Sequence, residues 1–178
     1  MLPWGHLFVA ALPVVAYVLV RDRRLPTPKL LYVVFVGSQF PDLVDKPLAH
    51  QFLLIPNGRM FAHSLVVAVP LCLVVTLAVR RSGHLREGVT FAFAYLSHIV
   101  ADYRHLLLRP DPRLDSNMLW PLVPARPGRL EPYWAGPNSI NVKLWTVFSV
   151  AVLSLTAYLA WRELRQSARD GDATGERG

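Results

Sequence analysis

Long apolar runs alternate with short polar connections along this chain. About 20 helical residues cross a hydrocarbon core of about 30 Å, and somewhat shorter or tilted helices are tolerated. Five runs approach this length, so we expect an all-α membrane protein with about five transmembrane or partly re-entrant helices. The predicted helices cover residues 4–20, 29–44, 62–79, 88–108 and 141–161.

The second run is the least regular of the five. It carries polar and helix-breaking residues near its end, which are Gly37, Ser38, Gln39 and Pro41. Irregular or polar backbone at membrane depth has to be covered by protein. We therefore predict a partial or re-entrant helix whose polar end is covered by neighbouring helices.

The segments outside these runs differ from them in composition. Residues 109–140 contain seven prolines, and because proline cannot continue a helix, we predict an irregular outer loop there. Residues 166–178 are polar and lack apolar periodicity, so we predict a disordered cytoplasmic tail. The predicted domains are a polytopic helical membrane domain at 1–165 and a tail at 166–178.

The distribution of basic residues predicts the orientation of the chain. If the N-terminus faces outward and the C-terminus inward, eleven of the 19 Lys and Arg residues lie on the inner side. Inner connections of membrane proteins are enriched in such residues. We therefore predict an N-out, C-in protein, located in the inner or plasma membrane as a multi-pass protein.

Composition supports this class and excludes several others. Of 178 residues, 53% are hydrophobic and 17% are charged, against about 45–50% and about 25% in soluble domains. A freely soluble enzyme, an acidic disordered protein and a coiled coil are therefore poor interpretations. The net charge of +7 does not indicate nucleic-acid binding, because the basic residues lie between apolar runs and form no stripe.

Cysteine usage narrows the possible chemistry further. Cys72 is the one cysteine and lies inside an apolar run, so neither an intrachain disulfide nor a CxxC site is possible. Any metal ion must therefore be held by histidine and carboxylate side chains.

Ionisable residues within or at the ends of apolar runs are costly in a membrane, and they are candidates for function. Alternation of the five predicted helices brings these residues to one membrane level, with His98 one turn deeper. The candidates are His6, Asp42, Asp45, His63, His98 and Asp102. We expect them to converge, whichever way the whole protein is oriented.

Spacing refines the roles within this set. His98 and Asp102 are four residues apart, so they project from one helix face and are suited to chelate one ion. Asp42 and Asp45 are three apart, which suits one ligand and one partner that acts as a general base or an acceptor for a ligand. Mixed imidazole and carboxylate ligands favour zinc, manganese or iron over calcium, and zinc is our first choice.

Each candidate also has a purely structural interpretation. His6 taken alone is better explained as an interfacial histidine beside Trp4. The two aspartates are explained equally well as helix-capping residues after Pro41. His98 and Asp102 are compatible with a proton relay or a structural polar contact. Joint convergence is the argument for a shared site. His50, His84 and His105 receive no predicted role.

Several short segments carry a family resemblance when taken in order. They are Gly5-His6-Leu7, the segment from Gly37 to Asp42 with Asp45, the segment from Arg59 to His63-Ser64, the segment from Ser97-His98 to Asp102, and Leu119-Trp120-Pro121. Together they resemble a family of inner-membrane-associated, metal-dependent hydrolases that is also described as LexA-binding. The resemblance covers about residues 1–125, and it implies a metal site more strongly than it implies a substrate.

This chain departs from the pattern of that family at three positions. Gly58 precedes Arg59 where the family usually has a histidine, Ala62 replaces a threonine, and Lys46 follows Asp45 where the family has a histidine. The departures leave the five predicted ligands in place. Accessory roles of the missing histidines do not carry over.

The sequence therefore predicts a membrane-embedded hydrolase that uses a divalent metal ion, with zinc first. His6, Asp42, His63, His98 and Asp102 are the predicted ligands, and Asp45 is the predicted catalytic base or second partner. The expected partners are the lipid bilayer and an ester or phosphoester substrate, lipid or lipid-linked, at the outer membrane boundary. Arg59, Arg104 and Arg109 lie near that level and could pair with an anionic headgroup.

Two other functions stay open at this stage. A metal or proton transporter would use the same side chains along a path, although the inner halves of the third and fifth runs offer few polar residues. A non-catalytic membrane scaffold or regulator would use them to join helices. Oligomeric state is not predicted.

Overall fold

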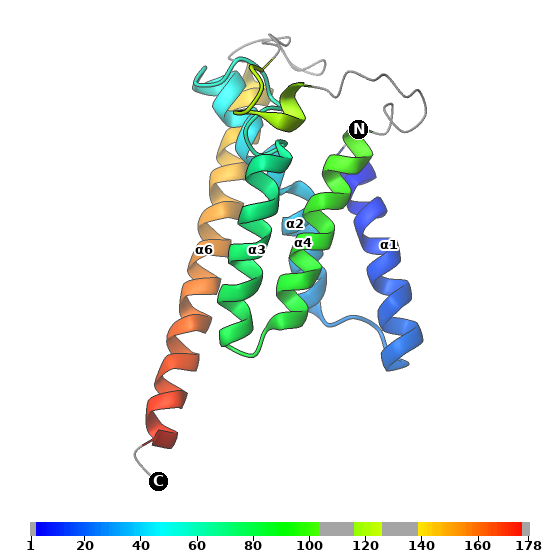
Figure 1. The fold of residues 1–178 in the computed structure, drawn as a ribbon, viewed down its shortest axis with the longest axis vertical. Helices are drawn as coiled ribbons and strands as arrows, with labels where there is room; N and C mark the ends of the chain where they lie inside the picture. Colours follow the sequence, from blue (N-terminus) through cyan, green and yellow to red (C-terminus); the bar gives the residue numbers. More distant parts are fainter. Residues whose placement is uncertain (1–2, 104–115, 126–138, 176–178) are drawn as a thin grey trace.

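The computed structural model describes residues 3–103, 116–125 and 139–175, and every secondary-structure element in these residues is a helix. The all-α prediction is confirmed. The helices run side by side, and α6 extends beyond the others at one end (Figure 1). The five α-helices are α1 (Pro3–Asp22), α2 (Pro28–Lys46), α3 (Leu65–Arg81), α4 (Leu85–Asp102) and α6 (Ile140–Gly175).

Helix α2 shows how local sequence sets these boundaries. Thr27 is its N-cap, and the hydroxyl of Thr27 accepts a hydrogen bond from the backbone N–H of Leu30 at 3.3 Å. Pro28 occupies the first helical position, where no N–H is needed. The helix continues through Pro41 to Lys46 and passes directly into a π-helical turn, η1 (Pro47–Gln51). The predicted irregular run is therefore one continuous helix.

The central packing contact of the bundle is between α2 and α4, and α1 and α3 flank it. Gly37 of α2 permits this close approach. A Cβ atom at Gly37 would lie 2.9 Å from Ala94 Cβ and 2.9 Å from the carbonyl oxygen of Phe91. Buried side chains fill the adjoining layers. Ala10, Val14, Val18, Leu30, Val34 and Ala94 form an aliphatic layer between α1, α2 and α4, and Ala68, Cys72, Tyr95, Ile99 and Tyr103 form a mixed aliphatic and aromatic layer between α3 and α4.

The outside of the bundle is also apolar. Leu12 on α1 is 65% exposed and Val147 on α6 is 68% exposed, and many further large aliphatic side chains are exposed on α1, α3 and α6. Exposed apolar surface of this extent is typical of proteins that contact membranes. Two helical segments, Pro3–Asp22 and Ile140–Glu163, are long and apolar enough to cross a membrane.

Two predicted boundaries differ from the observed ones. The segment after residue 165 was expected to be disordered, but α6 continues to Gly175. The sequence there lacks an apolar face yet contains good helix formers such as Arg165, Gln166 and Ala168 and no proline, so the helix begun in the apolar run can propagate. The run predicted at 88–108 ends as a helix at Asp102, and residues 104–108 lie outside the described residues.

The predicted proline-rich loop is described only in part. Residues 116–125 form the short 3-10 helix η2 (Ser116–Leu119) and the turns that follow it, and η2 packs against α3. The remainder of the loop up to residue 138 lies outside the described residues.

Candidate metal centre

The ionisable residues singled out from the sequence gather at one end of the bundle. This is the end where α1 begins, where α2 and α4 end, and where the chain enters α3 (Figure 1). Their side chains are almost completely buried, with residue exposures between 0% and 7%. The residues are His6, Asp42, Asp45, His63, His98 and Asp102. The structure thus brings together all six predicted positions, through the alternation of helices that the sequence suggested.

Asp45 fixes the segment that leads into α3. Its carboxylate accepts hydrogen bonds from the backbone N–H groups of Met60 at 3.0 Å, Ala62 at 2.7 Å and His63 at 3.2 Å. The Nδ1 atom of His63 lies 2.8 Å from Asp45 Oδ2. A carboxylate accepts, so Nδ1 of His63 carries the proton and its Nε2 presents a lone pair. Asp45 therefore orients His63 as well as the surrounding backbone.

A hydrogen bond from Nδ1 also orients the ring of His98. Its Nδ1 donates to the backbone carbonyl of Ser38 at 2.6 Å. Because a carbonyl can only accept, neutral His98 must also present the lone pair of Nε2. The Nε2 atoms of His63 and His98 are 3.2 Å apart. Two lone pairs at this distance require a cation between them, either a shared proton or a metal ion.

Two aspartates surround this pair of nitrogens. Asp42 Oδ1 lies 3.6 Å from Nε2 of His63 and 3.9 Å from Nε2 of His98. Asp102 Oδ2 lies 3.7 Å and 3.9 Å from the same two atoms. Ligand atoms about 2.1 Å from a tetrahedral zinc ion are about 3.4 Å from one another. The observed separations are close to that value.

His6 extends the cluster on the α1 side. Its ring stacks on His98 with 3.7 Å between centroids, and its Nε2 lies 3.2 Å from Asp102 Oδ1. Two sets of three residues could each hold an ion, because within each set the ligand atoms lie within 4.8 Å of one another. The sets are His6, His98 and Asp102, and Asp42, His63 and His98. Because the sets share His98, the cluster is compatible with one ion or with two adjacent ions.

Two cationic side chains next to the cluster form ion pairs with its aspartates. Lys46 Nζ lies 2.5 Å from Asp42 Oδ2, and Arg59 Nε lies 2.9 Å from Asp102 Oδ2. The side chain of Arg59 is 49% exposed, so its guanidinium reaches from the cluster to the surface. Its predicted place near the site is correct, whereas Arg104 and Arg109 lie outside the described residues.

The residues present fit a divalent metal ion. Within the described part of the chain, Asp42 Oδ1 and His6 Nδ1 are buried without a hydrogen-bond partner. An unsatisfied buried carboxylate oxygen is costly, and Asp42 Oδ1 points toward the bare nitrogens of His63 and His98. Two imidazoles with carboxylates are ligands that zinc commonly uses.

Sequence reasoning missed three supporting residues. Lys46 had a usable signal, since it lies one helical turn after Asp42. Ser38 acts through its backbone carbonyl, which no side-chain pattern reveals. Tyr95 donates from its hydroxyl to the carbonyl of Ala62 at 2.6 Å, and this holds the segment before His63 against α4.

Of the three histidines without a predicted role, the two that the structure describes lie outside the cluster. The ring of His50 is packed against Gly58, where an added Cβ would lie 2.7 Å from His50 Nε2. His84 is at the opposite end of the bundle, beside Lys29 and Glu163. His105 lies outside the described residues.

Comparison with known proteins gives one match. The sequence model of the YdjM inner membrane protein family matches residues 1–165, which is most of the chain. No curated protein and no solved structure matches the chain. The match supports the inner-membrane part of the resemblance noted above, and its description mentions neither hydrolysis nor LexA binding.

Proposed function

The chain belongs to the YdjM inner membrane protein family, and from this membership and the buried cluster we propose that it is a multi-pass, metal-dependent hydrolase. The proposed substrate is an ester or phosphoester, lipid or lipid-linked, at the outer membrane boundary. The proposed ion is divalent, with zinc first. The observation that carries the proposal is the pair of Nε2 lone pairs of His63 and His98, 3.2 Å apart and flanked by two aspartates.

The residues divide into ligands and supports. His63, His98, Asp42 and Asp102 are the proposed ligands, and His6 completes the set. When bound, a divalent ion at such a site supplies a water with a pKa of about 7 and polarises the oxygen of an ester or phosphoester. Asp45, which already accepts four hydrogen bonds, is better suited to orient His63 than to take up a proton.

Arg59 supports the choice of an anionic substrate. Its guanidinium is bonded to Asp102 through Nε, and its side chain is half exposed. The remaining guanidinium donors suit bidentate pairing with phosphate. In this arrangement Arg59 holds the substrate where the cluster meets the surface.

The apolar exterior of the bundle supports the multi-pass part of the proposal. Exposed aliphatic residues on α1, α3 and α6 are best accommodated by lipid. The cluster then lies at one boundary of the hydrocarbon region, since every contributing residue is near a helix end. In the N-out orientation this is the outer boundary, where lipid headgroups are found.

Elemental analysis of the full chain purified in detergent tests the proposal. We expect one or two divalent ions per chain and hydrolysis of a fluorogenic ester or phosphodiester. His98→Ala and Asp102→Ala should each abolish both bound metal and hydrolysis, because each removes a proposed ligand, while membrane insertion is retained. His84→Ala, at the far end of the bundle, is the matched control and should change neither.

The same measurements separate the rival functions. A wild-type chain that binds no ion stoichiometrically would contradict the proposal and favour a scaffold whose polar residues join helices. A chain that binds the ion, hydrolyses neither substrate and moves the ion into proteoliposomes would instead be a transporter.

A further inference from the structure

A large apolar cavity extends between the helices from the end of the bundle opposite the candidate metal centre. Its volume is about 690 Å³, and it is lined by α2, α3, α4 and α6. This is within the range of about 300–1,000 Å³ that is typical of ligand sites. Helix α6 packs mainly on α2 and η1, and the cavity occupies the space between α6 and the α3–α4 pair.

The cavity is elongated, and its lining surface is mostly apolar. Along α2 the cavity extends from Pro28 to Phe40, which is roughly 18 Å at 1.5 Å per residue. Val75 and Val79 of α3 and Phe91 of α4 close one wall. These proportions fit an extended hydrocarbon chain better than a compact polar ligand.

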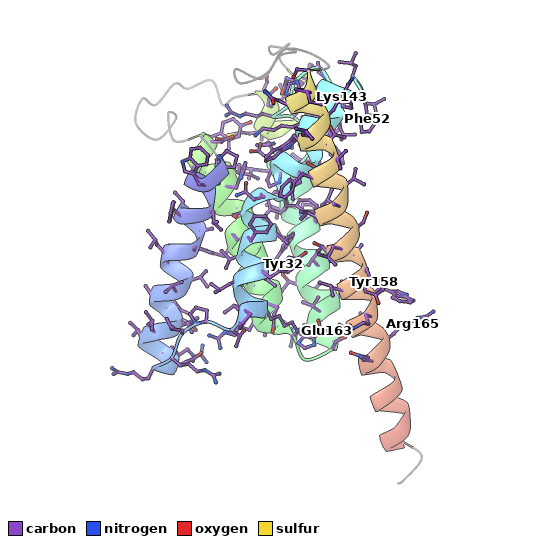
Figure 2. All side chains as sticks on the ribbon, turned by 180° about the vertical axis from the view of Figure 1, so that it is seen from behind. Tyr32, Phe52, Lys143, Tyr158, Glu163 and Arg165 are labelled. Carbon is purple, nitrogen blue, oxygen red and sulfur yellow. The ribbon has the colours of Figure 1, made fainter. Side chains whose placement is uncertain are left out.

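Charged residues surround one end of the cavity. Lys29 Nζ lies 2.5 Å from Glu163 Oε1 and 3.8 Å from Glu87 Oε1, and His84 Nε2 lies 3.4 Å from Glu163 Oε1. Arg162 lines the same end and is exposed. Figure 2 shows Tyr32 and Glu163 on the inner side of α6, with Tyr158 and Arg165 projecting away from it.

The charged side chains at this end balance, with Lys29 and Arg162 against Glu87 and Glu163, so any positive potential there comes from the backbone. Helices α2 and α4 both begin here, and the first amide N–H groups of a helix favour anions. The N-cap of α4, His84, makes no capping hydrogen bond through its side chain. The side chain of Lys29 is 41% exposed, and its ammonium is paired with Glu163 and Glu87. A headgroup phosphate therefore has to compete with these two carboxylates for it.

We propose that this cavity binds one acyl chain of a membrane phospholipid, with the headgroup phosphate between Lys29 and Arg162. The chain belongs to an inner membrane family, so phospholipid is the hydrocarbon-bearing ligand that surrounds it. An apolar groove that is open to the surface, extends roughly 18 Å along α2 and has Lys29 and Arg162 at one end suits an amphiphile with an anionic head. No residue of the metal cluster lines the cavity, so this proposal is independent of the proposed hydrolase activity.

Filling the cavity tests the proposal. Ala157 and Ala160 of α6 line it, whereas Ala151 of the same helix does not, and all three positions are exposed. The full chain is purified, exchanged into phosphatidylglycerol of defined acyl length, and analysed by native mass spectrometry. We expect one retained phospholipid per wild-type chain, about tenfold less in Ala157→Phe and Ala160→Phe, and the wild-type amount in Ala151→Phe.

A second pair of variants tests the headgroup without altering the packing. Arg162→Gln should lower the affinity for phosphatidylglycerol several-fold relative to a neutral diacylglycerol. Arg165→Gln is the matched control, because Arg165 stacks on Trp161 with 4.2 Å to the ring centroid and does not line the cavity. It should leave the preference unchanged.

Three results would overturn the proposal. One is a wild-type chain that retains no phospholipid. Another is equal retention by Ala157→Phe and Ala151→Phe. The third is a dimeric wild-type chain that Ala157→Phe converts to a monomer, since a second copy would then cover the cavity. Bound metal should be unchanged in all these variants, so failure here leaves the metal proposal intact.

Discussion

At the scale of single residues, Asp45 shows how a buried charge can be stabilised without a cationic partner. Both of its oxygens accept hydrogen bonds, three of them from the backbone between Met60 and His63. Such partners of ligand residues determine ring orientation and basicity. The sequence predicted that Asp45 lies beside the site, because of its spacing from Asp42. The sequence could not show whether Asp45 acts as a catalytic base or orients His63. That depends on which backbone N–H groups of the segment before α3 reach the Asp45 carboxylate.

Asp45→Asn separates these two roles. An amide offers one acceptor oxygen and places an NH₂ group against backbone N–H donors. If Asp45 orients His63, we expect metal affinity to fall about 10–100-fold, measured by competition with a chromophoric chelator. A catalytic base would instead give unchanged affinity and a rate about 10²–10⁴-fold lower. Asp22→Asn is the control, because Asp22 pairs with Arg86 and not with the cluster.

At the scale of helices, the apolar runs alone predicted the five α-helices, because an apolar run of this length is typical of a helix and too long for an ordinary strand. Successive helices alternate in direction, and this alternation predicted that the proposed ligands near the helix ends lie at one end of the bundle. What the sequence did not indicate was close backbone packing, such as the carbonyl of Ser38 reaching His98. The extension of α6 to Gly175 was also missed, since helix propensity rather than apolar pattern maintains it.

Gly37→Ala tests the importance of that close packing. The new Cβ would lie 2.9 Å from the backbone carbonyl oxygen of Phe91, so α4 has to shift away from α2. We expect a destabilisation of about 1–3 kcal/mol, detected as a lower thermal midpoint in detergent, together with weaker metal binding through the displaced His98. Ser154→Ala, an exposed position on α6, should alter neither. An unchanged midpoint for Gly37→Ala would show that the contact relaxes freely.

At the scale of the whole molecule, the candidate metal centre lies at one end of the bundle and the charged end of the apolar cavity at the other. The proposed orientation places the first at the outer boundary and the second toward the inner boundary. Phe52, in the turn after η1, and Ser82, at the end of α3, mark these two ends. Figure 2 labels Phe52 at the metal end of the bundle.

Cysteine labelling in intact cells measures this orientation. In a Cys72→Ser background, Phe52→Cys should react with a membrane-impermeant maleimide from outside, because Phe52 is 53% exposed at the proposed outer end. Ser82→Cys should react only after permeabilisation. The reverse pattern would invert the topology and move the metal centre to the cytoplasmic side. Equal labelling of both would argue against a spanning bundle.

The proposed ligands come from four separate parts of the chain, namely α1, α2, the turn before α3, and α4. An ion bound there ties these segments together, so ion concentration and resistance to heat become linked quantities. At 100 times the dissociation constant the linkage amounts to about 2.7 kcal/mol. Chelation should therefore lower the thermal midpoint of the wild-type chain and leave that of His98→Ala unmoved. Under the proposed function, metal supply would then determine how long the protein survives in its membrane.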